Sequence, residues 1–93
     1  MAMVKLNLLN IFQLRVNKKF INYEGKNVKE VISKFLDEYG DRLDSELLDK
    51  TKQKFNSHVL ILLNGRNIKY LKNYKTNLNE GDELYISYAL AGG

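Results

Sequence analysis

Hydrophobic and polar residues alternate over residues 4–9, where Leu6 and Leu8 fall on the same face. This alternation predicts a β-strand with one buried face. The turn residues 17–19 precede a second predicted strand at 20–23, so the two strands form a candidate hairpin. The alternation also continues through Phe12, Leu14 and Val16. We therefore expect a second extended stretch there, with a bulge between the two stretches. The pattern does not fix the residue at which the first strand ends.

Residues 28–39 have the spacing of an amphipathic helix. The apolar stripe recurs every three or four residues and consists of Val28, Val31, Ile32, Phe35, Leu36 and Tyr39. Asn27 is placed to cap the first turn, and Glu30 can reach back to the Asn27 amide as in a capping box. Gly40 is placed to end the helix in a left-handed conformation.

Residues 41–57 are highly charged and carry a weaker helical pattern. Leu43, Leu47, Thr51 and Phe55 are spaced four residues apart. This spacing predicts a short second helix on the surface, capped by an aspartate.

The last third of the chain predicts further strands. An apolar run covers 59–63, Asn64 and Gly65 form a turn, and 68–71 is a short extended or 3₁₀ piece. A final strand is predicted over 84–88. The order of elements is β-β-α-(α)-β-β.

The run at 59–63 is apolar at every position, whereas a strand with one wet face should alternate. One of its faces therefore needs a cover. Residues of the predicted second helix or of the 66–75 loop supply it, or the face is an exposed patch that docks a partner. The candidate docking residues, from this strand and its expected neighbours, are Leu9, Leu60, Leu62 and Tyr85.

Composition narrows the classes of function. The 93 residues fit one domain, and 44% hydrophobic with 28% charged residues describes an ordinary globular chain. The net charge is +4, but the lysines are interspersed with acids and form no basic block, so we expect no nucleic-acid partner. No apolar run is long enough to cross a bilayer and no signal peptide is recognisable, so we expect no membrane association and a cytoplasmic location.

Side chains suited to catalysis are scarce. Cysteine is absent, which excludes disulfides, thiolate metal sites and thiol nucleophiles. The single histidine, His58, adjoins the apolar run and is interpreted as a residue at the edge of a strand. We therefore expect no metal site, no bound cofactor and no catalytic residues of the chain's own.

The most informative feature is the ending Ala-Leu-Ala-Gly-Gly at 89–93, directly after the last predicted strand. Glycine carries no Cβ, so a tail that ends in Gly92 and Gly93 can lie extended in a narrow slot with its carboxylate open to attack. We therefore divide the chain into a domain at 1–88 and a flexible tail at 89–93.

The order of elements and the tail together resemble an α+β fold of the β-grasp, or ubiquitin-like, type. Such a fold has a mixed sheet of four to five strands, one main helix across it and a short second helix. Segments 62–68, 76–84 and 92–93 resemble the family of small sulfur-carrier proteins. Length favours the branch of the small subunit of molybdopterin synthase, because thiamine-pathway carriers lack a region like 41–57.

The resemblance implies a mechanism. A ubiquitin-activating-type enzyme would use ATP to adenylate Gly93, and a sulfur donor would displace AMP to leave a thiocarboxylate. Leu90, Ala91 and Gly92 would be recognised in the slot of the partner. In molybdopterin synthase, two such carriers insert their tails into the large catalytic subunit, which implies a heterotetramer that makes the molybdenum or tungsten cofactor.

Three alternatives stay open. The activated Gly93 could be joined to lysines of other proteins, as in a ubiquitin-like modifier. The chain could carry sulfur for thiamine or for tRNA thiolation. It could also be a plain β-grasp module that binds RNA or an acidic protein, with the glycines incidental.

Overall fold

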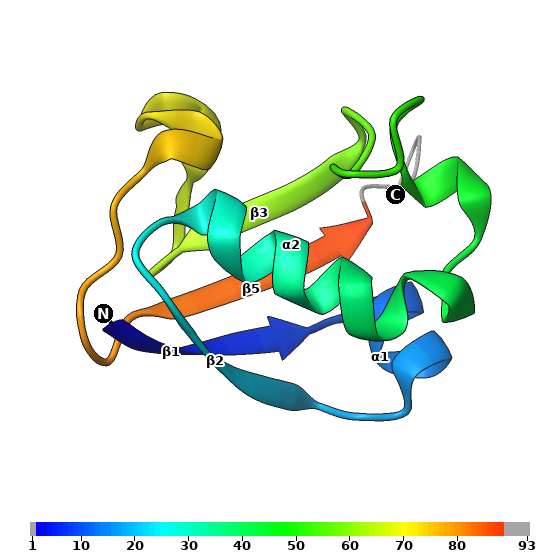
Figure 1. Ribbon diagram of the computed structural model, residues 1–93, viewed down its shortest axis with the longest axis horizontal. Helices are drawn as coiled ribbons and strands as arrows, with labels where there is room; N and C mark the ends of the chain where they lie inside the picture. Colours follow the sequence, from blue (N-terminus) through cyan, green and yellow to red (C-terminus); the bar gives the residue numbers. More distant parts are fainter. Residues whose placement is uncertain (1, 89–93) are drawn as a thin grey trace.

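The computed structural model describes residues 2–88, which form a five-stranded mixed sheet crossed by one main helix (Figure 1). The strands are β1 (Ala2–Leu8), β2 (Phe20–Gly25), β3 (Val59–Leu63), β4 (Arg66–Asn67) and β5 (Glu83–Tyr88), and the α-helices are α1 (Asn10–Val16) and α2 (Val28–Tyr39). The sheet order is β2-β1-β5-β3-β4, with β1 parallel to β5 and the other pairs antiparallel. This is the predicted β-grasp fold.

The core lies between α2 and one face of the sheet. The predicted apolar stripe of α2 packs onto the inward residues of β1 and of the central strand β5. The fully buried residues of these three elements are Val4, Leu6, Leu8, Val28, Val31, Ile32, Phe35, Leu84 and Ile86. Side chains on a strand alternate between the two faces, so the other face of the sheet is left for contacts outside the core.

The start of α2 agrees with its predicted cap, and its end does not. The Asn27 Oδ1 accepts a hydrogen bond from the Glu30 N–H at 2.9 Å, which confirms the N-cap. The Glu30 carboxylate, however, accepts from the Lys26 N–H at 2.9 Å and not from Asn27. Gly40 is right-handed (φ −55°, ψ −34°), so the predicted left-handed end is wrong. The chain instead tightens into a 3₁₀ turn that buries Leu43.

The short second helix exists, but it lies between the first two strands. Residues 10–16 form α1, where an extended stretch was predicted. Phe12 and Val16 are buried one helical turn apart, while Leu14 is 70% exposed. The Phe12 ring meets the Phe55 ring edge-to-face at 5.2 Å, so α1 packs on a segment that is distant in the sequence.

The helix predicted over 41–57 is absent from the structure. This segment holds 3₁₀ turns at Gly40–Arg42 and Ser45–Leu47 and a bridge between Leu48 and Phe55. The Asp49 carboxylate accepts from the Thr51 N–H (3.0 Å) and hydroxyl (2.7 Å). Aspartate in such a local turn competes with helix formation, so the segment folds as irregular structure on buried Leu47 and Phe55.

Candidate functional site

The strand that leads to the glycine tail is the central strand of the sheet. β5 lies between β1 and β3, and it ends at Tyr88, whose register partner on β3 is Val59. In Figure 1 this end of β5 is at the same end of the molecule as α1. The predicted tail residues Leu90, Ala91, Gly92 and Gly93 lie outside the residues that the structure describes. The chain therefore reaches the tail from a rigid element.

Tyr88 is surrounded by polar groups of three segments. The Asn10 side chain forms two hydrogen bonds with the Tyr88 backbone, and the His58 ring stands edge-on to the Tyr88 ring at 6.4 Å. A hollow of about 270 Å³ opens beside them, lined also by Leu47 and by the carboxylates of Asp44 and Glu46. The residue before the tail is thus next to a small hollow of mixed apolar and polar lining, where Asp44 is paired with Arg15 at 3.3 Å.

His58 lies directly before β3, at the position expected for a residue at the edge of a strand. It is exposed, and its N–H donates to the Asn56 Oδ1 at 2.7 Å. Within residues 2–88, no three histidine, aspartate or glutamate side chains come together in a way that could hold a metal ion. No helix in that range is long and apolar enough to cross a membrane.

The outer face of β3 and β5 brings three of the four predicted docking residues together. Leu9, Leu62 and Tyr85 line one hollow of about 480 Å³, with Asn64, Gly65 and Glu83 around it. Leu60 is half-buried on the same face as Leu62, two residues along β3, and its register partner is Ser87. The 41–57 and 66–75 segments do not fully bury Leu60 or Leu62. We call Leu9, Leu60, Leu62 and Tyr85 the outer patch.

The rim of the outer patch is polar and carries a negative charge. The Tyr85 hydroxyl donates to the Glu83 carboxylate at 3.3 Å, and the Asn7 amide donates to the same oxygen at 3.3 Å. The charge of Glu83, with smaller effects of desolvation and of that hydrogen bond, raises the pKa of the Tyr85 hydroxyl. Tyr85 therefore remains a neutral donor at physiological pH. An apolar centre with a polar rim is the usual composition of a protein–protein interface.

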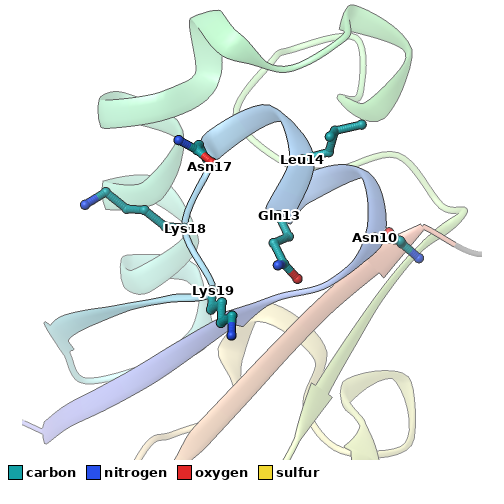
Figure 2. A pocket seen from close by; sticks show the side chains of 6 residues that line it. All are labelled: Asn10, Gln13, Leu14, Asn17, Lys18 and Lys19. Carbon is teal, nitrogen blue, oxygen red and sulfur yellow. The ribbon is translucent and has the colours of Figure 1, made fainter.

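A broader hollow of about 660 Å³ lies on the exposed side of α1 (Figure 2). Gln13 extends from α1 toward the sheet, Leu14 points away from it, and Lys18 and Lys19 lie on the segment that follows α1. Lys18 and Lys19 place two positive charges beside this hollow.

Comparison with known proteins gives a clear result at the level of structure only. No protein-family model and no curated protein matches the chain. Among solved structures, small archaeal modifier protein 1 from Methanosarcina acetivorans is 26% identical over 100% of this chain and 98% of its own, with a TM-score of 0.86. By structure, the chain is similar to proteins of the ubiquitin-like sulfur-carrier family, at low sequence identity.

Two other solved structures share the fold at lower identity. The structure of the BexX/CysO complex from Amycolatopsis orientalis contains a chain 21% identical over 97% of this chain and 99% of its own, with a TM-score of 0.77. A putative molybdopterin converting factor, subunit 1, from Pyrococcus furiosus is 18% identical over 97% of this chain and 100% of its own, with a TM-score of 0.70. The relatives are small non-catalytic carriers or modifiers. These likenesses do not distinguish one kind of carrier or modifier from another.

Proposed function

We propose that the chain is a sulfur carrier whose Gly93 carboxyl is adenylated and then converted to a thiocarboxylate. The observation that carries the proposal is the continuity between the central strand β5 and a tail whose last residues are Gly92 and Gly93. The fold that carries this strand matches a small archaeal modifier protein over 100% of this chain and 98% of the other.

The chemistry needs two steps, because a carboxylate is a poor electrophile. The Gly93 carboxylate attacks the α-phosphorus of ATP, pyrophosphate leaves, and an acyl adenylate forms. A sulfur nucleophile then attacks the acyl carbon, and AMP leaves with the bonding electron pair. With hydrosulfide as donor the product is the thiocarboxylate. The chain supplies the acyl group, while a ubiquitin-activating-type enzyme binds ATP and performs the activation.

Within this function we propose the molybdopterin pathway, with the chain as small subunit of a molybdopterin synthase. Two observations support this branch. The chain carries the 41–57 segment, which thiamine-pathway carriers lack. The Pyrococcus furiosus protein with the same fold is a putative molybdopterin converting factor subunit. The large catalytic subunit would then accept the tail, and the outer patch would dock the carrier both on this subunit and on the adenylating enzyme.

Protein modification is the second candidate function, because the chain is similar to a small archaeal modifier protein from Methanosarcina acetivorans. It shares the adenylation of Gly93 but uses a lysine amine as the nucleophile, which forms an isopeptide. Covalent adducts of the chain on cellular proteins would favour this function. A free thiocarboxylate without adducts would favour the sulfur carrier.

The deciding experiment measures the intact mass of the chain after incubation with ATP, sulfide and a ubiquitin-activating-type enzyme of the source cell. We expect the mass to increase by the difference between one sulfur and one oxygen, and only when ATP is present. If no such enzyme yields an adenylate or a thiocarboxylate, the proposed function is wrong.

Leu62→Asp is expected to weaken binding to the adenylating enzyme by about tenfold or more. The substitution places a charge in the centre of the outer patch, where central apolar contacts usually carry most of the binding energy. The KM for the carrier in adenylation reports the effect.

Met3→Asp is the matched control, because Met3 is an exposed apolar residue of β1 outside the outer patch. It should leave this KM unchanged. Equal KM values for the wild type and Leu62→Asp would show that the enzyme does not dock on this face.

A further inference from the structure

We propose that Asn10 is a positioning residue. Its side chain continues the hydrogen bonding of β1 to β5 at Tyr88, beyond the end of β1, and so holds the root of the tail. The inference rests on the proposed function and names a residue of this chain that acts in it. Neither the hydrophobic pattern nor the resemblance to sulfur carriers pointed to Asn10.

The backbone of β1 stops one step short of Tyr88. The parallel ladder between β1 and β5 extends to the register pair Leu8 and Ile86, and the Leu9 N–H donates to the Ile86 carbonyl at 3.0 Å. In a continuing parallel ladder, the next acceptor for β5 would be the Leu9 carbonyl. That carbonyl instead accepts from the Phe12 N–H (3.0 Å) and the Gln13 N–H (3.5 Å), as α1 begins.

The Asn10 side chain takes over the ladder at this point. Its Oδ1 accepts from the Tyr88 N–H at 3.1 Å, and its Nδ2 donates to the Tyr88 carbonyl at 3.3 Å. A carboxamide offers one acceptor oxygen and N–H donors, so it can bond the strand as a peptide group does. Tyr88 is therefore held by Asn10 on one side, and its register partner Val59 lies on the other.

The backbone of Asn10 fits the same role. Its φ of 38° lies in the left-handed region, which asparagine tolerates better than most residues with a side chain. Its Oδ1 also accepts from the Ile11 N–H at 2.8 Å, which fixes the orientation of the carboxamide. Figure 2 shows Asn10 beside the end of β5, where the chain turns into α1. One residue thus ends β1 and bonds the end of β5.

This contact fixes the backbone of Tyr88, the residue that directly precedes the tail. A segment that starts from a fixed point loses less conformational freedom when it enters a narrow slot, and this preorganisation strengthens binding. The reacting carboxyl is five residues beyond Tyr88, so the enzyme must place it from this root. Loss of the contact should therefore raise the KM for adenylation and leave kcat unchanged.

Asn10→Gly tests the contact without straining the backbone, since glycine adopts positive φ freely. Asn17→Gly is the matched control, because Asn17 also has a positive φ (63°) but ends α1 on the side away from Tyr88. We expect amide hydrogen exchange at Tyr88 to become about 5- to 10-fold faster in Asn10→Gly. This factor is at the low end of what the loss of two hydrogen bonds predicts, because both bonds are exposed. Exchange at Leu84 and Ile86 should not change in either variant.

Kinetics test the positioning role itself. In ATP-dependent adenylation we expect Asn10→Gly to raise the KM for the carrier about 5-fold at unchanged kcat, and Asn17→Gly to match the wild type. Unchanged exchange at Tyr88, or equal acceleration in both variants, would overturn the contact with Asn10. Faster exchange with an unchanged KM would overturn its role in positioning.

The failure of this inference is distinguishable from failure of the proposed function. A wild-type chain that no activating enzyme adenylates overturns the carrier function and the kinetic role of Asn10 together. The exchange rates at Tyr88 still decide whether Asn10 completes the sheet.

Discussion

Gly92→Val is expected to reduce thiocarboxylate formation at least about 100-fold, which corresponds to about 2.7 kcal/mol of lost stabilisation of the reacting complex. Valine adds a branched side chain next to the reacting residue, where the proposed slot admits only backbone. The core is formed by residues between Ala2 and Ile86, so the thermal unfolding temperature should not change. Intact mass after incubation with enzyme, ATP and sulfide measures the loss.

Ala89→Val is the matched control for this substitution. It adds the same branch nearer to β5, at a residue that we do not expect to enter the slot, and loading should stay within about twofold of the wild type. A second variant appends one alanine after Gly93 and so moves the carboxylate away from the reacting position. If either the extended chain or Gly92→Val acquires sulfur at the rate of the wild type, Gly93 is not the acceptor.

The parts of the fold that were predicted correctly depend on local sequence. Asn27 caps α2 because its side chain reaches an amide three residues away, and Asn64 with Gly65 forms the β3–β4 turn because both adopt positive φ (50° and 89°). The strand β3 could be predicted from its own five consecutive apolar residues, without knowledge of the strands that pair with it. Such elements can be predicted because their causes lie within a few residues.

The parts that were predicted wrongly depend on contacts across the chain. Phe12, Leu14 and Val16 satisfy the alternation of a strand, and Phe12 with Val16 also satisfies the spacing of a helix. In the structure Phe12 packs on Phe55, which is more than forty residues away in sequence, so a local pattern does not reveal this contact. The spacing at 41–57 predicted a surface helix, but the segment forms 3₁₀ turns and an Asp49–Thr51 turn instead, with Leu47 and Phe55 buried.

The candidate site shows the same division. The outer patch was predicted because an all-apolar strand signals a second apolar face, and the structure brings Leu9, Leu62 and Tyr85 into one hollow. Asn10 was missed, since its bonds to Tyr88 join residues 78 positions apart. The available signal was an asparagine directly after a predicted strand, which is consistent with a left-handed turn but does not identify its partner.

Phe12→Ala is expected to lower the free energy of unfolding by about 3–5 kcal/mol, the range for truncation of a buried phenylalanine. Phe12 is fully buried, and its ring is the contact through which α1 meets Phe55. Leu14→Ala is the matched control on the same helix, and at 70% exposure it should change stability by no more than about 0.5 kcal/mol. Urea denaturation with a common m-value measures both.

This pair of variants also separates the two conformations that the sequence allows for residues 10–16. In a strand, residues 12 and 14 would share one face, and the two truncations would have similar costs. In α1 they lie on different faces, so the costs must differ several-fold. If Phe12→Ala does not fold, Phe12→Leu retains most of the apolar volume and should still cost more than Leu14→Ala. Equal losses for positions 12 and 14 would contradict the helix, and with it the turn at Asn10 that ends β1 beside Tyr88.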